Sequence, residues 1–249
     1  MCIRDSISMP AGGYTLAYTV GSDLAMKRFV SKGQTLDLLK DFTPISSALE
    51  SVSCIAVSST MPVSSIHDLI AYAKKNPGKL NFGSAGMNSS QHVTGELFRQ
   101  HGVDMVHVPF SGLAPALVAV MGGQVEVAIT NVASASAALR DGKVKVLAVT
   151  RPKRYDGAPD IPTVGEALPG FNMPVAFFGF FGPPGLPQPV LSRLSGEIGK
   201  AMEAPEVREK ARELYMAVIY TNPEQFQTMI REAIDNYGKV VKAAGIQPQ

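Results

Sequence analysis

Cysteine and long apolar runs are both scarce in this chain of 249 residues. Its two cysteines, Cys2 and Cys54, cannot build a disulfide framework or a zinc cluster. A chain of this length buries enough apolar surface to fold without disulfide bonds or a bound metal ion. The scarcity of cysteine is therefore compatible with the cytosol and with an oxidising periplasm. No run of about 18 apolar residues is present, so we expect no part of the chain to be embedded in a membrane.

Net charge is also small, because 23 basic side chains stand against 21 acidic ones and leave +2. The sequence has no basic stripe interleaved with aromatic residues, which argues against a general nucleic-acid-binding surface. Apolar residues at 45% and charged residues at 18% exclude a disordered chain or a coiled coil. We therefore expect a globular protein without a nucleic-acid partner.

Catalytic and metal-binding signatures are missing too. The sequence contains no Gly-x-Ser-x-Gly elbow, no Walker lysine after a glycine loop, and no Gly-x-Gly-x-x-Gly after a predicted strand. His92, His101 and His107 are nine and six residues apart, a spacing that matches no metal site. These absences favour a binding protein over an enzyme, and we expect neither a metal nor a cofactor.

Strand-like and helix-like runs alternate along the chain, which is typical of an α/β fold. Strands are predicted at 14–20, 42–49, 53–58, 79–82, 106–108, 125–130, 144–150 and 175–181. Helices are predicted after Ser64 or Ser65, at 91–100, after Pro115, at 133–139 and in three stretches beyond residue 190. The nearly all-apolar run at 144–150 is of the kind that is buried on both faces of a parallel sheet. The phenylalanines within 175–181 are interpreted as strand core rather than a stacking platform.

Small residues fill the loop from Gly83 to Ser90, between a predicted strand and the next helix. A helix N-terminus presents unpaired N–H groups and the positive end of a dipole, so such a loop is able to hold a carboxylate or phosphate. A helix cap and a tight turn explain the same residues without a ligand. A second loop of this kind, 109–112 before Pro115, favours the anion interpretation, because both loops would lie at the carboxyl ends of strands in an open sheet.

The candidate ligand-binding residues lie in these two loops, at the start of the following helix or at the end of the strand 125–130. They are Ser84, Ala85, Gly86, Ser89, Ser90, His92, Phe110, Ser111, Gly112 and Asn131. Backbone N–H groups of 84–86 and 110–112 are the expected donors, with help from the serine hydroxyls and one contact from Asn131. Two alternatives stay open: His92 belongs to the surface or the capping layer, or Ser84 or Ser89 works with His92 in a small hydrolase or isomerase.

Several short motifs, in a fixed order, resemble the substrate-binding proteins of tripartite tricarboxylate transporters, the Bug family. They are GKLNFGSAG at 78–86, SSQH at 89–92, HVPFSG at 107–112 with PAL at 115–117, GQVEV at 123–127, LAVT at 147–150, PDIPT at 159–163, PEVR at 205–208 and KAAG at 242–245. The resemblance covers about residues 10 to 246 and rests on the order of the motifs rather than on any one of them.

The resemblance implies a two-lobed α/β fold of the type II periplasmic-binding-protein kind, which closes on a small carboxylate and delivers it to the permease subunits of a membrane transporter. It implies no catalysis, a periplasmic location, and lobes formed by 1–78 with 150–249 and by 79–149. We expect a monomer. A receptor subunit that presents its ligand to a sensor would share this site and differ in its partner.

The N-terminal sequence departs from the family pattern. Residues 10–16 resemble a family motif that follows a signal peptide, a first strand, a glycine-rich loop and a helix, so the first lobe is expected to be incomplete at its N-terminus and ligand binding to be weaker. Residues 1–6 match nothing in the family and are interpreted as an assembly or cloning artefact. Further departures at Met87, at 110–111, at 130–131 and at Phe177 affect the identity of the ligand rather than the fold.

Overall fold

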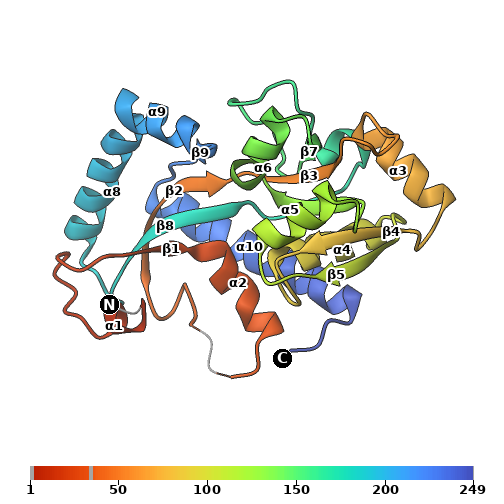
Figure 1. The fold of residues 1–249 in the computed structure, drawn as a ribbon. Helices are drawn as coiled ribbons and strands as arrows, with labels where there is room; N and C mark the ends of the chain where they lie inside the picture. Colours follow the sequence, from red (N-terminus) through yellow and green to blue (C-terminus); the bar gives the residue numbers. More distant parts are fainter. Residues whose placement is uncertain (1–2, 34–35, 249) are drawn as a thin grey trace. The chain divides into compact units, whose positions relative to one another are not determined.

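Two β-sheets, each with its own helices, make up the fold (Figure 1). The structure is a computed structural model, and it describes residues 3–33 and 36–248. Contacts divide the chain into two compact units: unit 1 is drawn from the segments 1–51, 174–238 and 247–249, and unit 2 from 52–173 and 239–246. The predicted α/β class is confirmed.

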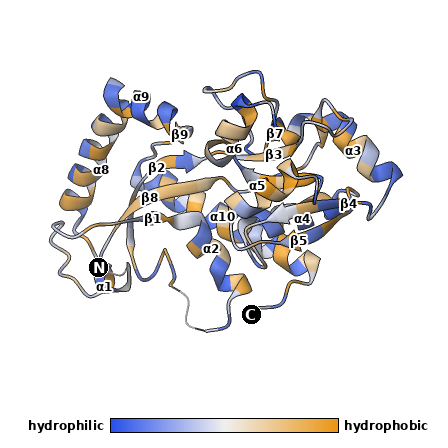
Figure 2. Cartoon of the chain, viewed as in Figure 1, coloured by the Kyte–Doolittle hydropathy of each residue, from blue (hydrophilic) through white to orange (hydrophobic). Residues whose placement is uncertain are grey.

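Unit 1 is built on an antiparallel sheet with strand order β1-β8-β2-β9. The strands are β1 (Ala17–Val20), β8 (Ala176–Gly182), β2 (Thr43–Ser51) and β9 (Met216–Val218). The helices are α1 (Ile3–Ile7), α2 (Gly21–Val30), α8 (Gln188–Glu203), α9 (Pro205–Glu213) and the first part of α10 (Pro223–Ala244). Apolar and polar residues are mixed along α8 (Figure 2), as expected for a helix with one face against a core.

The core of unit 1 is aromatic on one face of β8. Phe177 and Phe181 are fully buried, and their ring centroids lie 5.7 and 5.2 Å from that of Phe226 on α10. Phe178 and Phe180 point to the opposite face because side chains alternate along a strand, and there they contact the ring of Tyr18. The strand-core interpretation is thus correct for Phe177 and Phe181.

Helix α2 is absent from the sequence prediction, and its N-terminus explains why. Its N-cap residue, Val20, makes no side-chain capping bond, so the sequence carries no start signal there. Gly21 lets this turn approach the sheet, because a Cβ at that position would lie 2.2 Å from the ring of Phe177. Tertiary packing therefore places this helix, with little help from local signals.

Unit 2 is built on a mixed sheet with strand order β5-β4-β6-β3-β7. The strands are β3 (Ser53–Ser58), β4 (Leu80–Ser84), β5 (Met105–Pro109), β6 (Val127–Asn131) and β7 (Val144–Val149). The helices are α3 (Ile66–Lys75), α4 (Ser90–Gln100), α5 (Leu113–Met121), α6 (Val132–Arg140) and the short α7 (Val164–Ala167). Strand β4 runs parallel to β5 and β6, whereas β3 runs antiparallel to β6 and β7.

Strand β7 corrects the expectation of a parallel strand buried on both faces at 144–150. It is the last strand of the sheet and pairs antiparallel with β3. Lys145, near the start of β7, donates from Nζ to the carbonyl oxygens of Met61 and Val63, at 2.7 and 2.6 Å. An apolar run therefore marks burial here, but it does not report strand direction.

The unit boundaries also differ from the predicted lobes, which placed 52–78, 150–173 and 239–246 with the first lobe. Strand β3 lies between β6 and β7, so it belongs to the sheet of unit 2. The segment after β7 stays with the same sheet, because Val149 N donates to Pro162 O at 2.9 Å. At the end of this segment, the Phe171 ring packs on Phe98 of α4, with centroids 4.8 Å apart.

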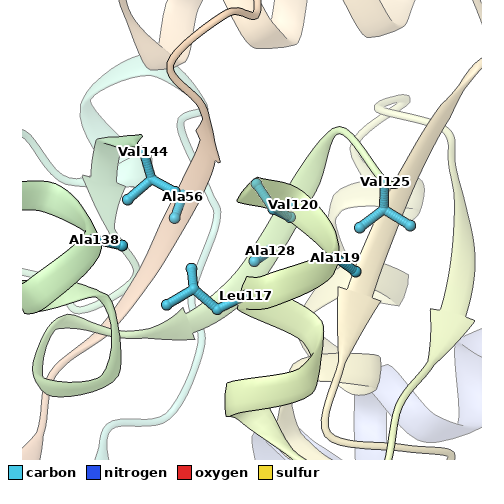
Figure 3. Packing of buried hydrophobic residues seen from close by; sticks show 8 residues of the cluster. All are labelled: Ala56, Leu117, Ala119, Val120, Val125, Ala128, Ala138 and Val144. Carbon is cyan, nitrogen blue, oxygen red and sulfur yellow. The ribbon is translucent and has the colours of Figure 1, made fainter. Parts of the chain in front are cut away.

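Small residues let α5 and α6 pack closely on one face of the unit 2 sheet (Figure 3). Ala56 of β3 and Ala128 of β6 meet Leu117 and Val120 of α5 and Ala138 of α6, and all five are buried. Helix α4 packs on the other face, where Gly95 leaves room for the ring of Phe82. The sheet is therefore covered on both sides, and its edges carry the loops.

We predict that Gly95→Ala destabilises the protein by about 1–3 kcal/mol, because the added methyl overfills a closed core. A Cβ at Gly95 would lie 2.0 Å from the Phe82 ring, whose side chain is itself buried. The matched control is Gly196→Ala on α8, where a Cβ meets nothing within 4 Å and the helix should gain about 0.5–1 kcal/mol. Urea unfolding measures both, and equal stability of the two variants would contradict this packing.

Candidate functional site

Three parallel strands of unit 2 end at the same edge of the sheet, at Ser84, Pro109 and Asn131. Helices α4, α5 and α6 begin just beyond these ends, so three helix N-termini meet there. We call this region, residues 84–90, 109–113 and 131–132, the carboxyl edge. The positive ends of three helix dipoles and their unpaired N–H groups favour an anion at this edge.

The two predicted loops form one continuous surface within the carboxyl edge. Phe110 N donates to the carbonyl oxygen of Ser84 at 3.1 Å, which links the end of β4 to the end of β5. Gly86 adopts a φ of +121° and a Cβ there would lie 3.3 Å from Phe110 O, so this position favours glycine on both counts. The structure thus brings 84–86 and 110–112 together, as the sequence predicts.

No acidic side chain competes for these helix N-termini, since none lies in the first turn of α4, α5 or α6. In contrast, α2, α3, α7, α9 and α10 each carry Asp or Glu in the first turn. Among the described residues, the positive electrostatic potential of these three N-termini is therefore not neutralised by an acidic side chain of the first turns, and it favours binding of a negatively charged ligand.

Backbone donors at the carboxyl edge divide into occupied and available groups. The amides of Gly86 and Phe110 are used inside the loops, by Ser84 Oγ and by Ser84 O. The amides of Ala85, Ser111 and Gly112 have no acceptor among the described residues, and no side chain caps α5. The available donors are thus a subset of those predicted.

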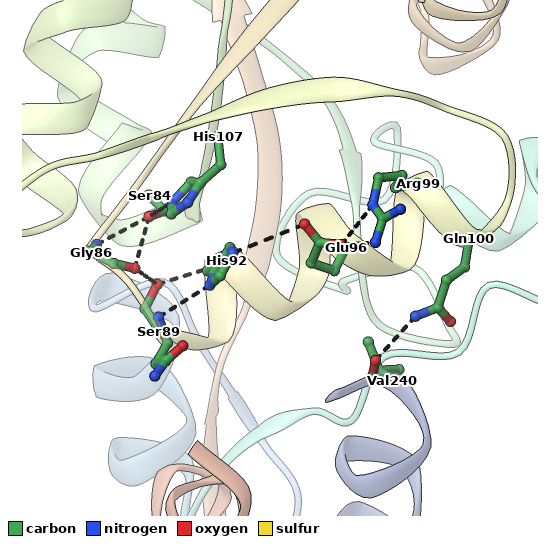
Figure 4. A network of polar contacts seen from close by, with 10 residues as sticks. Ser84, Gly86, Ser89, His92, Glu96, Arg99, Gln100, His107 and Val240 are labelled. Carbon is green, nitrogen blue, oxygen red and sulfur yellow. Dashed lines mark hydrogen bonds and ion pairs between the residues drawn. The ribbon is translucent and has the colours of Figure 1, made fainter. Parts of the chain in front are cut away.

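Ser84 is the polar centre of the loop and is fully buried (Figure 4). Its Oγ accepts from Gly86 N at 3.0 Å, lies 3.0 Å from Gly86 O and lies 2.5 Å from Nε2 of His107. A hydroxyl donates one hydrogen bond and accepts two, so these three contacts use its full hydrogen-bonding capacity. The geometry gives Ser84 a structural role in the loop, and a direct contact of this hydroxyl with a ligand stays a prediction.

Two other candidates serve as helix caps. Ser89 Oγ accepts from His92 N at 3.2 Å at the start of α4, and it donates to Gly86 O at 2.7 Å. Asn131 Oδ1 accepts from Ser134 N at 2.7 Å at the start of α6. The capping interpretation is correct for Ser89, yet each cap occupies one N–H of a first turn and leaves others available. Ser90, beside Ser89, is half-buried at the first position of α4.

His92 is buried and packs against a residue that the sequence did not single out as a site residue, His107. Their ring centroids lie 4.1 Å apart in a stacked pair, and His107 also stacks on Phe82 at 4.9 Å. Burial lowers the pKa of His107 to about 4, with His92 adding to the effect, and burial lowers the pKa of His92 against the opposing effect of Glu96. Both imidazoles are therefore neutral near pH 7.

The predicted nucleophile and base pair is not formed. The His92 ring faces the amide of Asn88, which donates to Nδ1 at 3.1 Å, and Glu96, 4.0 Å from Nε2. Ser89 meets His92 through the backbone amide rather than the ring. Neither Ser84 nor Ser89 contacts the imidazole of His92, so the pairing of a serine hydroxyl with His92 that such a hydrolase or isomerase needs is not formed.

Among the described residues, no group of three or more His, Cys, Asp or Glu is placed to hold a metal ion. Nor does any helix in 3–33 and 36–248 combine the length and apolarity needed to cross a bilayer.

Two sheets flanked by helices, with an anion-favouring edge on one of them, define a solute-binding protein of the two-lobed periplasmic kind. The solved structures agree. An R. palustris protein solved with adipate is 30% identical, with a TM-score of 0.82 over 99% of this chain and 83% of its own. MatC from Rhodopseudomonas palustris with bound malate is 29% identical, with a TM-score of 0.72 over 96% and 82%.

Residues 6–246 match the family described as the tripartite tricarboxylate transporter family receptor, and the chain belongs to this family. A Pseudomonas sp. (strain P51) protein from the tcbD-tcbE intergenic region is 31% identical over 235 residues, which are 93% of this chain and 69% of that protein. BugT of Bordetella pertussis is 26% identical over 239 residues, 94% of this chain and 73% of its own. The resemblance seen in the motifs is confirmed, and members of this family are substrate-binding proteins rather than enzymes.

We predict that the free energy of unfolding falls as the pH drops from about 6.5 to about 4. Native His107, with a pKa of about 4, stays unprotonated in that range, whereas the unfolded chain binds the proton at the ordinary value of 6.5. Urea unfolding at several pH values measures the slope. His107→Gln should remove part of it, and an unchanged slope in that variant would contradict the neutral, buried state of His107.

Proposed function

We propose that this protein captures a small carboxylate at the carboxyl edge of unit 2 and presents it to the membrane subunits of a tripartite tricarboxylate-type transporter. The observation that carries the proposal is the meeting of three helix N-termini without an acid in any of their first turns. A carboxylate supplies the missing negative charge and accepts several N–H bonds at once.

The available donors fit one end of such a ligand. In this proposal the amides of Ala85, Ser111 and Gly112 donate to the carboxylate oxygens, and the half-buried Ser90 and Asn131 flank them. Gly86 and Phe110 shape the floor, since their own amides are used inside the loops. Ser84, Ser89 and His92 act behind this surface through the contacts described above.

The site and the relatives both support a proposal for the substrate class. The donors are neutral backbone groups, which hold a carboxylate without selecting the rest of the molecule by charge. Relatives about 30% identical were solved with adipate and with malate, two dicarboxylates. We infer a small dicarboxylate or a similar organic acid as the ligand.

Family membership supports the proposed partner and compartment. A receptor of this family serves a transporter, so the proposed partner is a set of permease subunits and the proposed location is the periplasm. We propose that the protein works as a monomer, with every residue of the proposed site in unit 2.

We predict that a panel of adipate, malate, citrate, glutamate and benzoate, each raised to about 10 mM, contains at least one ligand that raises the melting temperature without being converted. Gly86→Ala should weaken binding of that ligand about tenfold or more, because its Cβ strains the loop and crowds Phe110 O.

The matched control is Gly123→Ala. Gly123 also has a positive φ, of +71°, but a Cβ there meets nothing within 4 Å and the residue follows the C-terminal end of α5. This variant should lose some stability and keep the affinity. Equal affinity in Gly86→Ala and the wild type, or turnover of any panel compound, would contradict the proposal.

A further inference from the structure

Residues 84–89, which we call the ligand loop, contact two stacked imidazoles, those of His92 and His107 (Figure 4). His92 on α4 accepts from the amide of Asn88 through Nδ1, and His107 on β5 contacts Ser84 Oγ through Nε2. Ser84 in turn binds Gly86, next to the donor that we assign to Ala85. Both histidines thus contact the loop through its own polar groups.

The bond between Asn88 and His92 fixes the protonation state of that ring. A backbone N–H always donates, so Nδ1 of His92 must carry a lone pair and the proton of the neutral ring sits on Nε2. A second proton has to bind at Nδ1, where the Asn88 amide already points. Protonation therefore replaces an attractive contact with two opposed N–H groups.

Asn88 is sensitive to the loss of that contact. Its φ is +60°, in the left-handed region that non-glycine residues visit at a cost in free energy. Asn88 keeps this conformation because surrounding contacts hold it, and its bond to His92 is one of these contacts.

The surroundings of the pair oppose a positive charge. His107 lies between His92 and the ring of Phe82, so a charge on one imidazole opposes a charge on the other. The charged groups that face the pair come from α4: Glu96, whose carboxylate favours a positive charge on His92 against the effect of burial, and its ion-pair partner Arg99. Strand β4 presents Phe82 and Ser84. The lowered pKa values of His92 and His107 agree with this geometry.

We propose that His92 and His107 are positioning residues for the ligand loop, which hold its carboxylate-binding shape while both rings are neutral and release it when the pair takes up a proton. This inference rests on the proposed function. Its consequence is that the protein binds its carboxylate more weakly in acid than the ionisation of the ligand alone explains.

The test compares the affinity for adipate, or for malate if adipate gives the smaller thermal shift, at about pH 7.5, 5 and 4 by calorimetry. His92→Asn places an amide oxygen near the position of Nδ1, so it keeps an acceptor for Asn88 that does not titrate. His107→Gln keeps a polar group for Ser84. His67→Asn on α3 is the control, since His67 is exposed and lies outside the carboxyl edge.

We expect the wild type and His67→Asn to lose affinity at least about twofold more than the double variant His92→Asn with His107→Gln between pH 7.5 and 4, because native His107, with a pKa of about 4, is protonated in about half of the molecules at pH 4. Ligand ionisation is the same for all variants and cancels in this comparison. Circular dichroism at each pH confirms that the chain is folded.

A backbone readout separates positioning from general stability. The amide 15N of Asn88 should show a coupling across the hydrogen bond to Nδ1 of His92 near neutral pH, and the coupling should vanish in acid together with the affinity. Identical pH profiles in the wild type and the double variant would overturn this inference alone. Failure of the wild type to bind any panel compound near pH 7.5 would overturn the proposed function and this inference with it.

Discussion

The parallel register of β4 with β5 and β6 is the constraint on which the site depends. Pairing of Ser84 with Pro109, and of Gly83 with Ala128, brings the ends of these strands to one edge of the sheet. Because each strand leads into a helix, directly for β6 and through a short loop for β4 and β5, the same register collects the N-termini of α4, α5 and α6. An anion site then arises from backbone groups, without a single basic side chain in the proposed set of donors.

Glycine and alanine keep that register possible, because the loops and helices must approach the sheet closely. Gly83 lies against Ala116 and the ring of Phe110, where a Cβ would come within 3.2 Å of both. Gly95 admits Phe82 beneath α4 on the opposite face. The same kind of small residue therefore allows both the close packing of unit 2 and the shape of its ligand loop.

The loops of the site were predictable from sequence, since small residues between a strand and a helix carry a local signal at 83–90 and 109–112. His107 was not, because its contact with Ser84 joins neighbouring parallel strands and leaves no periodicity in either. The sequence also did not predict that β3 belongs to unit 2. The apolar run at 53–58 indicates a strand, but it does not indicate which strands it pairs with. Helix α2 lacks a capping residue, so it had no start signal to find. Features with a local sequence signal, such as the two loops, could thus be predicted, whereas the pairing of strands distant in sequence was known only from the structure.

The most direct test of the central claim is a titration of the 15N-labelled protein with adipate, followed by the shifts of its backbone amides. If the carboxyl edge is the binding site, the largest changes fall on Ala85, Ser111 and Gly112 and on the first turns of α4, α5 and α6. Changes concentrated at the opposite edge of the sheet, where Lys79, Gly123 and Glu126 line a cavity of about 260 Å³, would contradict the claim.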